Sequence, residues 1–583
     1  MKTSIIILTY NKLDYTIQCI ESIRLYTSPG TYEIIIVDNN STDGTRDWLE
    51  QQDDVISILN ENNMGFPRGC NQGIDIASGT NILLLNNDVI VTENWLDNML
   101  NCLYSSNKVG AVSCVTNSCT YLQEIPVDYT DLESMQAFAS QYNSKSNPSA
   151  WEERLKLIGF CMLIKKSVVD QIGLLDEVFS PGNYEDDDYS TRIRMAGYKL
   201  LLCRDTFIHH YGSTSFKENR RYFDLLNRNK KKFIDKWGFN PNKAFYFNPD
   251  MVELIDMPID AEFKLLEVNC GCGGTLLKIK EKFMNSKLYG IEINENAANL
   301  SAMVAKRVQA DLHFNLSCPE QSFDYIIISD SLQRFYDPNQ IVSTMKRYLT
   351  PKGKLLMSVP NVMHHSVIKG LLDGEWTYGE YGAMDIDNLR FFTLKEIYKM
   401  LLENGYSNLS IIGQNNGTFA NPEWVHNLSG VIDKELIPQL DAFQYLVSAS
   451  NNELGTVIDE IRVASELSID CLTKLDDFHF DEIFNNIQLV VGADEEALQL
   501  LNKIGSWYFE KGDYKRVLPF FQKGLEINST DTDTLYNVSY FLMFIGETEI
   551  ATNYIRQLHE VDQNAFNDLL MVLADFKKDA QNV

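Results

Sequence analysis

One apolar run that ends abruptly in polar residues constrains this chain most. Residues 82–85 (Ile-Leu-Leu-Leu) are apolar, and Asn86, Asn87 and Asp88 follow them directly. The run predicts a buried strand, and polar side chains at its carboxyl end are costly unless a ligand binds there. Ligands of open α/β sheets bind at the carboxyl ends of strands. A carboxylate there suits a divalent cation, and a cation suits a diphosphate. We therefore predict a metal and diphosphate site at Asp88, with a plain polar turn as the alternative.

Two earlier stretches repeat this pattern of a strand followed by polar residues. Residues 5–8 are apolar and lead into Thr9-Tyr10-Asn11, and apolar residues at helical spacing follow as far as Leu25. Residues 33–37 predict the next strand, which is apolar from Ile34 to Val37 and ends in Asp38. Successive strand-to-helix units imply a parallel sheet with polar strand ends along one edge. Asp38 is placed to accept hydrogen bonds from a base or a ribose, and an ordinary turn aspartate is the alternative.

A glycine-rich loop separates these strands from the strand before Asp88. Gly65 and Gly69 lie close together in it, and Arg68 stands between them. Glycines let a backbone approach a ligand closely, and an arginine there could meet a phosphate.

The composition limits the classes of partner. The chain has 583 residues, enough for about three or four domains, and its formal net charge is −29. This charge opposes non-specific nucleic-acid binding and a general attraction to anionic membranes. No apolar run reaches the length of about 18 residues that predicts a membrane-spanning helix, and the first residues lack a signal-peptide pattern. Eleven scattered cysteines suit reduced thiols, so we expect a cytoplasmic protein.

The order of these motifs resembles that of family 2 glycosyltransferases with the GT-A fold, a Rossmann-like α/β architecture, and is similar to their rhamnosyltransferase-like branch. The resemblance covers about residues 3–237. It implies that Asp38 contacts the nucleotide base and that Asp88 binds Mn²⁺ or Mg²⁺. Asn86 stands where the family usually has a further acid. The donor-binding residues that the resemblance implies are Thr9, Tyr10, Asn11, Asp38, Asn40, Gly65, Arg68, Asn86, Asn87 and Asp88.

An acidic block extends the resemblance. Residues 185–188 are four consecutive acids at the start of a predicted helix, where the helix dipole alone would favour them. The resemblance implies that Asp186 is the general base, which takes a proton from the acceptor as it attacks the anomeric carbon. It implies that Glu185 and Asp188 hold the acceptor or the start of the helix.

The resemblance also assigns roles to residues around a histidine pair. His210 is implied as the second metal ligand, since a neutral imidazole is a common ligand, and His209 as its neighbour. Residues 157–162 are implied to be a strand on the acceptor side, and residues 212–215 a lid over the diphosphate. Residues 117–150 are polar and poorly periodic, so we interpret them as an insertion near the acceptor.

A second glycine turn begins another predicted α/β domain at about residues 260–415. Residues 263–268 predict a strand, residues 269–274 are the turn, and an acid follows about twenty residues later, as in folds that hold a ribose. The region resembles class I S-adenosylmethionine-dependent methyltransferases, which are doubly wound. The implied cofactor-binding residues are Glu267, Gly271, Gly273, Glu292 and Asp311. Asn269, Gln333 and Asn388 depart from the family pattern, so both a working enzyme and a domain without its chemistry stay open.

Residues 416–583 predict an all-α region. Gly512 and Gly546 stand 34 positions apart within similar helical stretches, which matches the period of tetratricopeptide repeats near residues 497–564. Such repeats form grooves that bind peptides, and a structural cap or dimer surface is the alternative.

Together these observations predict three parts, at residues 1–240, 260–415 and 416–583. The first hypothesis is a metal-dependent, inverting glycosyltransferase that uses a UDP- or dTDP-sugar and a protein acceptor such as flagellin, with methylation of the glycan as an added activity. The second keeps the enzyme and makes the acceptor a lipid-linked surface polysaccharide of the O-antigen type. The third is a non-catalytic scaffold, against which the residues Asp88, Asp186 and His210 argue.

Overall fold

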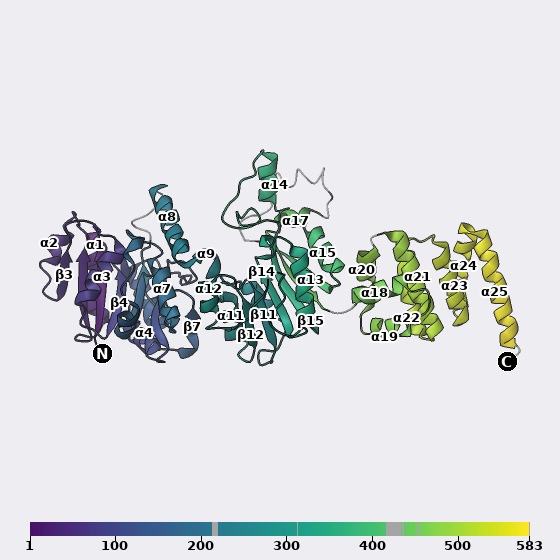
Figure 1. The fold of residues 1–583 in the computed structure, drawn as a ribbon, viewed down its shortest axis with the longest axis horizontal. Helices are drawn as coiled ribbons and strands as arrows, with labels where there is room; N and C mark the ends of the chain where they lie inside the picture. The colour runs from purple at the N-terminus through teal and green to yellow at the C-terminus, as the bar shows by residue number, and fades with distance from the viewer. Residues whose placement is uncertain are drawn as a thin grey trace. The chain divides into compact units, whose positions relative to one another are not determined.

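The computed structural model describes residues 1–212, 220–311, 313–415, 433, 436–451, 454–491 and 493–581 (Figure 1). By its contacts the chain divides into two compact units. The first is Met1–Val252 with Asn269–Arg307, and the second is Glu253–Val268 with Val308–Val583. The three parts predicted at 1–240, 260–415 and 416–583 stay predictions. Most of the predicted lid, residues 213–215, lies outside the described residues.

The first unit contains an eight-stranded sheet in the order β3-β2-β1-β4-β8-β6-β9-β7. Its strands are β1 (Thr3–Thr9), β2 (Tyr32–Asp38), β3 (Val55–Leu59), β4 (Asn81–Asn86), β6 (Val109–Val115), β7 (Trp151–Arg154), β8 (Cys161–Lys165) and β9 (Lys199–Phe207). β1 is parallel to β2 and β4, and β2 to β3, as the strand-to-helix repeats predicted. β8 is antiparallel to β4 and β6, and β7 to β9, so the sheet is mixed.

Helices cover both faces of this sheet. Ile5 and Ile7 of β1 pack in one core with α1 (Leu13–Tyr26) and α4 (Trp95–Leu103). Ile6 belongs to a second core with α3 (Phe66–Ile76), α6 (Lys166–Ile172) and α7 (Glu185–Met195). Successive strand residues point to opposite faces, so this α/β sandwich has three layers. Its elements are drawn in purple and blue in Figure 1.

The predicted insertion is packed and partly helical. α5 (Leu132–Tyr142) begins at a capping box, in which the Asp131 carboxylate accepts a hydrogen bond from Ser134 N at 2.8 Å. Met135 and Ala139 bury this helix against Phe207 of β9. The insertion therefore supports the chain just before His209. The strand predicted at residues 157–162 begins only at Cys161, because residues 157–160 form the turn before it.

The first unit also contains further helices and short strands. These are α2 (Thr45–Leu49), β5 (Val89–Ile90), the 3-10 helices η1 (Pro148–Ala150) and η2 (Glu177–Phe179), β10 (His209–His210), α8 (Arg220–Trp237), α9 (Pro241–Ala244), α11 (Gly274–Lys282), β12 (Lys287–Ile291), α12 (Glu295–Ser301) and β13 (Lys306–Arg307). α10 (Pro249–Glu253) lies at the end of the Met1–Val252 part.

The second unit contains the neighbouring strands β11 (Lys264–Val268), β14 (Phe323–Ser329), β15 (Leu349–Pro360), β17 (Gln444–Ser450) and β16 (Ser407–Gln414). β11, β14 and β15 are parallel, and β17 is antiparallel to both β15 and β16. Its helices before residue 450 are η3 (Leu332–Arg334), α13 (Pro338–Tyr348), α14 (His365–Leu372), α15 (Leu394–Glu403) and α17 (Ile437–Asp441).

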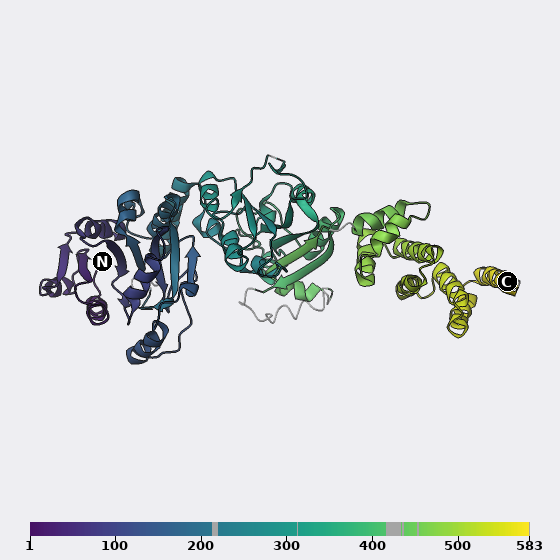
Figure 2. The ribbon, with the colours of Figure 1, turned by 90° about the horizontal axis from the view of Figure 1, so that it is seen from below.

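From Leu454 onward the described chain is helical, as Figures 1 and 2 show in green and yellow. The helices are α18 (Leu454–Val463), α19 (Ile469–Leu475), α20 (Phe480–Val491), α21 (Asp494–Lys511), α22 (Tyr514–Ile527), α23 (Thr532–Phe544), α24 (Thr548–Val561) and α25 (Gln563–Gln581). Gly512 and Gly546 follow α21 and α23 with φ of +81° and +88°, a conformation that favours glycine. The tetratricopeptide assignment stays a prediction. None of the helices in the described ranges has the length and hydropathy of a membrane span.

Candidate active site

The polar residues predicted to line a site lie at one edge of the first sheet. In the parallel register Thr9 of β1 stands opposite Asp38 of β2, and Leu8 stands opposite Asn86 of β4. All three strands therefore end at the same level, and Asp88 follows two residues beyond Asn86. This common edge is where ligands of α/β sheets bind.

Asp88 and His210 come together across a small second sheet. β5 pairs antiparallel with β10, with Val89 opposite His210, which brings the residue before Val89 alongside the imidazole. The Asp88 carboxylate oxygen Oδ1 lies 3.3 Å from His210 Nε2. Asn86 Nδ2 lies 3.5 Å from the same nitrogen. The two side chains predicted to hold a metal are thus neighbours, although 122 positions separate them in the sequence.

The surroundings of His210 orient its ring toward Asp88. Its Nδ1 donates a hydrogen bond to Ser118 O at 2.8 Å, which leaves Nε2 facing the carboxylate. The Asn117 side chain holds the His210 backbone on both sides. Its Oδ1 accepts a hydrogen bond from His210 N, and its Nδ2 donates one to His210 O. The Phe160 ring stacks on the imidazole with centroids 5.2 Å apart. Burial lowers the pKa of His210, but the hydrogen bond and the charge of Asp88 outweigh burial and raise it overall.

The Asp88–His210 pair fits a shared divalent cation. Neighbouring ligands of an octahedral ion at about 2.1 Å lie about 3 Å from each other, close to the 3.3 Å between Oδ1 and Nε2. One carboxylate oxygen and one imidazole nitrogen suit manganese-like ions. The described ranges contain no cluster of three or more His, Cys, Asp or Glu side chains that could hold a metal. A cation here would therefore depend on a ligand or on water for its other positions.

Asp38 has a structural role, and one of its two carboxylate oxygens has no hydrogen-bond donor among the described residues. Its side chain is fully buried, and Oδ2 accepts hydrogen bonds from Arg46 Nε at 2.8 Å and Ser41 N at 3.0 Å. The other oxygen, Oδ1, is buried and has no partner among the described residues. A buried acceptor without a donor is costly, so Oδ1 suits the N–H of a bound base.

Other predicted donor-binding residues form hydrogen bonds between the loops at this edge of the sheet. The Asn87 amide donates to Thr9 Oγ1 at 3.4 Å, and Asn11 Oδ1 accepts from Thr42 N at 2.8 Å. These bonds tie the loops after β1, β2 and β4 to each other. Tyr10, by contrast, has 52% of its surface exposed.

The glycine loop packs against protein rather than standing open. Gly65 has φ of +81°, and a Cβ there would lie 2.8 Å from the Cα of Pro181, so only glycine permits this approach. Arg68 lies 3.9 Å from Glu177 in a half-exposed ion pair. Asn40 takes the left-handed conformation, with φ of +70°. The close backbone approach predicted for the loop therefore occurs, with Pro181 as a partner that the sequence pattern did not indicate.

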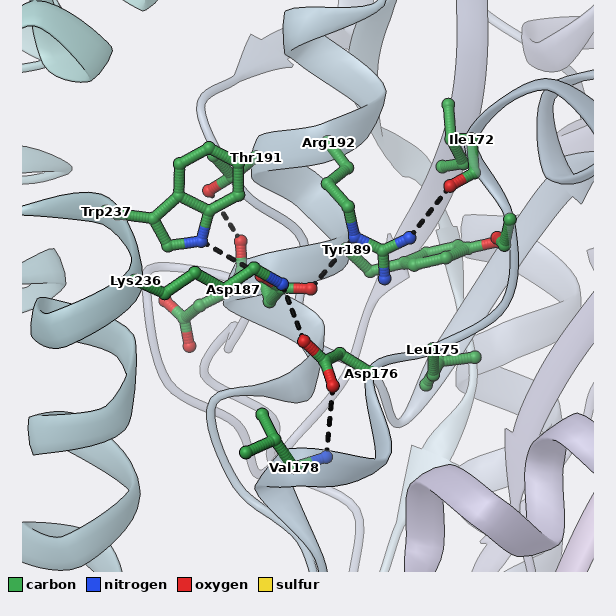
Figure 3. Close-up of polar contacts among 12 residues, drawn as sticks. Ile172, Leu175, Asp176, Val178, Asp187, Tyr189, Thr191, Arg192, Lys236 and Trp237 are labelled. Carbon is green, nitrogen blue, oxygen red and sulfur yellow. Dashed lines mark hydrogen bonds and ion pairs between the residues drawn. The ribbon is translucent and has the colours of Figure 1, made fainter.

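The four acids at the start of α7 fall into two pairs with different surroundings. Asp187 pairs with Lys156 at 2.6 Å. Asp188 is fully buried, and its carboxylate accepts from Lys236 at 2.6 Å, Arg192 at 2.9 Å and Trp237 at 2.9 Å. Figure 3 shows the labelled side chains of Lys236, Trp237 and Arg192 close together. These two acids are neutralised inside the protein, and Asp188 joins α8 to α7 rather than facing an acceptor.

Glu185 and Asp186 have no such cation at hydrogen-bond distance among the described residues. Burial and the charge of Asp187 raise the pKa of Asp186 to about 6, although Lys156 and the Gly159 N–H act in the opposite direction. Burial and the charge of Asp186 raise the pKa of Glu185 well above its usual value. Asp186 is only partly buried, and its raised pKa suits a carboxylate that receives a proton.

A short turn connects Glu185 and Asp186 to the Asp88–His210 pair. Gly159 N donates to Asp186 Oδ2 at 3.1 Å, and the next residue, Phe160, stacks on His210. The sequence analysis missed Asn117, Ser118 and Phe160 as supports of the site. Phe160 lies in a stretch that had been assigned to the acceptor side, whereas Asn117 and Ser118 carried no signal of their own.

The second glycine turn has the conformation that its glycines predicted. A Cβ on Gly271 would lie 2.9 Å from Ala244 O, and φ there is +54°; Gly273 has φ of +86°. Gly271 N donates to Glu292 Oε2 at 2.9 Å, and Asn294 N donates to Oε1 at 2.8 Å. Each carboxylate oxygen keeps a second lone pair, so these residues fit a ribose diol such as that of S-adenosylmethionine.

The two cofactor residues predicted in the second unit differ from each other. Glu267 is buried on β11, in register with Ile327 of β14. Asp311 is exposed and accepts hydrogen bonds from His313 N and Asn315 N. Asp311 therefore closes a surface turn, and its role toward a cofactor stays a prediction.

Residues 4–173 match the family Glycosyl transferase family 2, and residues 215–411 match a methyltransferase domain family. The low-salt glycan biosynthesis hexosyltransferase Agl10 of Haloferax volcanii is 28% identical over 211 residues, which are 34% of this chain and 66% of Agl10. The glycosyltransferase AglE of the same organism is 25% identical over 271 residues, 42% of this chain and 84% of AglE. A mannosyltransferase structure from Pyrobaculum calidifontis, in complex with GDP-Man and Mn²⁺, aligns with 40% of this chain and 64% of its own, at 20% identity and a TM-score of 0.31.

The chain therefore carries a domain that matches family 2 glycosyltransferases, joined to one that matches a methyltransferase domain family. The matched part spans just under two thirds of Agl10. Both α/β folds that the sequence predicted are confirmed.

Proposed function

We propose that the first domain is a metal-dependent, inverting glycosyltransferase that uses a nucleoside diphosphate sugar. The observation that carries the proposal is the Asp88–His210 pair, 3.3 Å apart, at the same strand-end edge as Asp38 and linked through Gly159 and Phe160 to Asp186. A divalent cation held by Asp88 and His210 would neutralise charge on the leaving diphosphate.

The transfer is a single displacement in this proposal. The acceptor oxygen bonds to the anomeric carbon while the bond from that carbon to the diphosphate oxygen breaks, and the acceptor proton passes to Asp186. A carboxylate whose pKa is about 6 is ionised at neutral pH and still basic enough to hold the proton. Burial and the charge of Asp186 raise the pKa of Glu185, and Glu185 lies beside Asp186 at the start of α7, where it can contact the acceptor. Asp38 Oδ1 accepts the N–H of the base, which a uracil or thymine of a UDP- or dTDP-sugar provides.

For the acceptor, we propose a protein hydroxyl, for example on flagellin Ser or Thr, in the cytoplasm. The long helical region from Leu454 onward supports this choice, because stacked helices commonly bind extended peptides. A glycan acceptor, such as a lipid-linked O-antigen type polysaccharide, is the second candidate. It is favoured by the relative Agl10, which is named for glycan biosynthesis.

One experiment separates these proposals. The full chain is incubated with labelled UDP- and dTDP-sugars, with Mn²⁺ or with EDTA, together with whole-cell protein or lipid extracts. We expect Mn²⁺-dependent release of the nucleoside diphosphate and label in the protein fraction. Label in lipid only would select the glycan acceptor, and no turnover with any donor would favour the scaffold.

Methylation of the transferred glycan is proposed as a second activity. The support for S-adenosylmethionine is Glu292, whose carboxylate lies at the glycine turn and accepts from Gly271 N; Gly271 itself packs against Ala244. Calorimetry of the full chain with S-adenosylmethionine tests binding, and Glu292→Gln is expected to weaken it. If the unaltered chain gives no binding heat, the domain has kept the methyltransferase fold but does not bind the cofactor.

A further inference from the structure

Helix α8 carries a stripe of residues along the acid block. Tyr222, Asn229, Phe233 and Lys236 follow each other at spacings of seven, four and three residues, which places them on one face of a helix. Asn229 and Phe233 are fully buried, and Tyr222 is half-buried. This face of α8 is therefore the one that packs against the loop before α7 and against α7 itself.

The middle of the stripe fixes α8 to that loop. The Asn229 amide nitrogen donates to three carbonyl oxygens, of Phe179 at 2.5 Å, Gly182 at 2.8 Å and Asn183 at 3.3 Å. Lys232 Nζ donates to Val178 O at 2.6 Å. One side chain with three backbone partners holds the loop in register with the helix.

The end of the stripe fixes α8 to α7. Lys236 bridges Asp176 and Asp188, and Trp237 Nε1 donates to Asp188, as Figure 3 shows for the labelled Asp176, Lys236 and Trp237. With both the middle and the end anchored, the position of Tyr222 in the first turn is set by the helix.

Tyr222 contacts the loop that leads into Glu185 and Asp186. Its hydroxyl donates to Asn183 Oδ1 at 3.3 Å, two residues before Glu185. Burial raises the pKa of Tyr222, and the charges of Glu185 and Asp186 raise it further. Asn183 and Tyr184 both have positive φ, of 74° and 72°. Two such non-glycine residues in succession are strained, and strained backbone gathers at functional sites.

We propose that Tyr222 is an acceptor-binding residue of the glycosyltransferase site. Its hydroxyl, now on Asn183, hydrogen-bonds a polar group of the acceptor so that the reacting hydroxyl meets Asp186. The inference rests on the proposed function and names a residue for the acceptor side of that site.

The test separates acceptor binding from donor binding. Tyr222→Ala and Tyr222→Phe are compared with the unaltered chain for transfer, for hydrolysis of the nucleotide sugar without acceptor, and for the apparent KM of donor and acceptor. We expect Tyr222→Ala to raise the acceptor KM on the order of tenfold, the effect of about 1.4 kcal/mol, and to change the donor KM and the hydrolysis rate by a smaller factor. Tyr222→Phe should restore the part of the acceptor affinity that the ring contributes.

Tyr104→Ala is the matched control. Tyr104 is another partly exposed tyrosine, whose hydroxyl donates to the amide oxygen of Asn81 at 2.6 Å, but Asn81 is the first residue of β4 and lies at the opposite edge of the sheet. An unchanged acceptor KM in Tyr222→Ala, or an equal loss of donor hydrolysis, would overturn the inference. A failure of the proposed function looks different, because the unaltered chain would then turn over no nucleotide sugar.

Discussion

At the scale of single residues, four consecutive acids have four different environments. Lys156 neutralises Asp187, and Lys236, Arg192 and Trp237 surround Asp188. Glu185 and Asp186 keep raised pKa values because burial and like charge act on them without a compensating ion pair. Only these two acids have the properties that proton transfer needs.

Asp186→Asn should separate activity from stability. We expect transfer to fall about 10²- to 10⁴-fold with the loss of a general base. A carboxyl pKa raised in the folded state adds stability below its unfolded value of about 3.9, and this stability is lost as pH rises through about 6. At pH 7.5 the neutral amide should therefore leave Tm unchanged or higher. Thermal unfolding and the kcat/KM profile measure this, and kcat/KM of the unaltered enzyme should rise through pH 6.

His210→Ala and Asp88→Asn should abolish stabilisation by metal. A ligand that binds only the folded state at 100 times its Kd adds about 2.7 kcal/mol, so MnCl2 with a nucleoside diphosphate should raise the Tm of the unaltered chain. His209→Ala is the control, because its imidazole contacts the Tyr129 hydroxyl at 2.7 Å and should keep the shift. Equal shifts in all variants would exclude the Asp88–His210 site.

At the scale of elements, pairs of strands and helices bring distant residues together. β5 and β10 join Asp88 to His210, and α8 is fixed to α7 through Asp188. The turn before β8 carries Phe160 onto the imidazole. The site therefore depends on how these elements pack as much as on the residues that contact a ligand.

Asp188→Ala should loosen the attachment of α8. Removing one partner from a buried ion pair costs about 3–5 kcal/mol, and we expect the lower end because Lys236 keeps Asp176 as a partner. Asp176→Ala should cost under about 1 kcal/mol, since this aspartate is partly exposed and surface pairs contribute little. Urea denaturation of both variants measures the difference. Similar losses would show that Asp188 is not the main partner of Lys236.

At the scale of the whole molecule, the compact units do not follow the order of the chain. The first unit includes Asn269–Arg307, and within it the Asn294 and Asn296 amides both donate to Trp237 O. The glycine turn contacts Ala244, whose carbonyl accepts from Cys272 N at 2.9 Å. The first compact unit therefore continues past residue 240 in its contacts.

A fragment that ends at residue 252 should be more stable than one that ends at residue 240. Phe245 is 1% exposed, its ring packs against Phe233 and Phe239, and its carbonyl accepts from the Tyr121 hydroxyl at 2.9 Å. Burial of a phenylalanine contributes about 1.5–3 kcal/mol. Chemical denaturation of both fragments measures this, and Phe245→Ala in the full chain should lose stability in the same direction. Equal midpoints for the two fragments would contradict the prediction.

Local patterns predicted much of the first domain. Apolar runs located β1, β2 and β4, and their polar ends placed Thr9, Asp38 and Asn86 at one edge, because parallel strands share a direction. The antiparallel strand β7 (Trp151–Arg154) was not predicted, since it is not an apolar run. The strand at residues 157–162 was predicted from the resemblance, but β8 begins only at Cys161.

The sequence by itself determined which polar residues follow the strands, because periodicity is a property of neighbouring residues; that Asp88 and His210 share a site was a prediction from the resemblance. Only the tertiary structure decided which acids of α7 are neutralised. Lys156, Lys236 and Trp237 lie 31, 48 and 49 positions from their partners, and the pKa of a carboxyl group depends on the charges near it in space rather than on its neighbours along the chain.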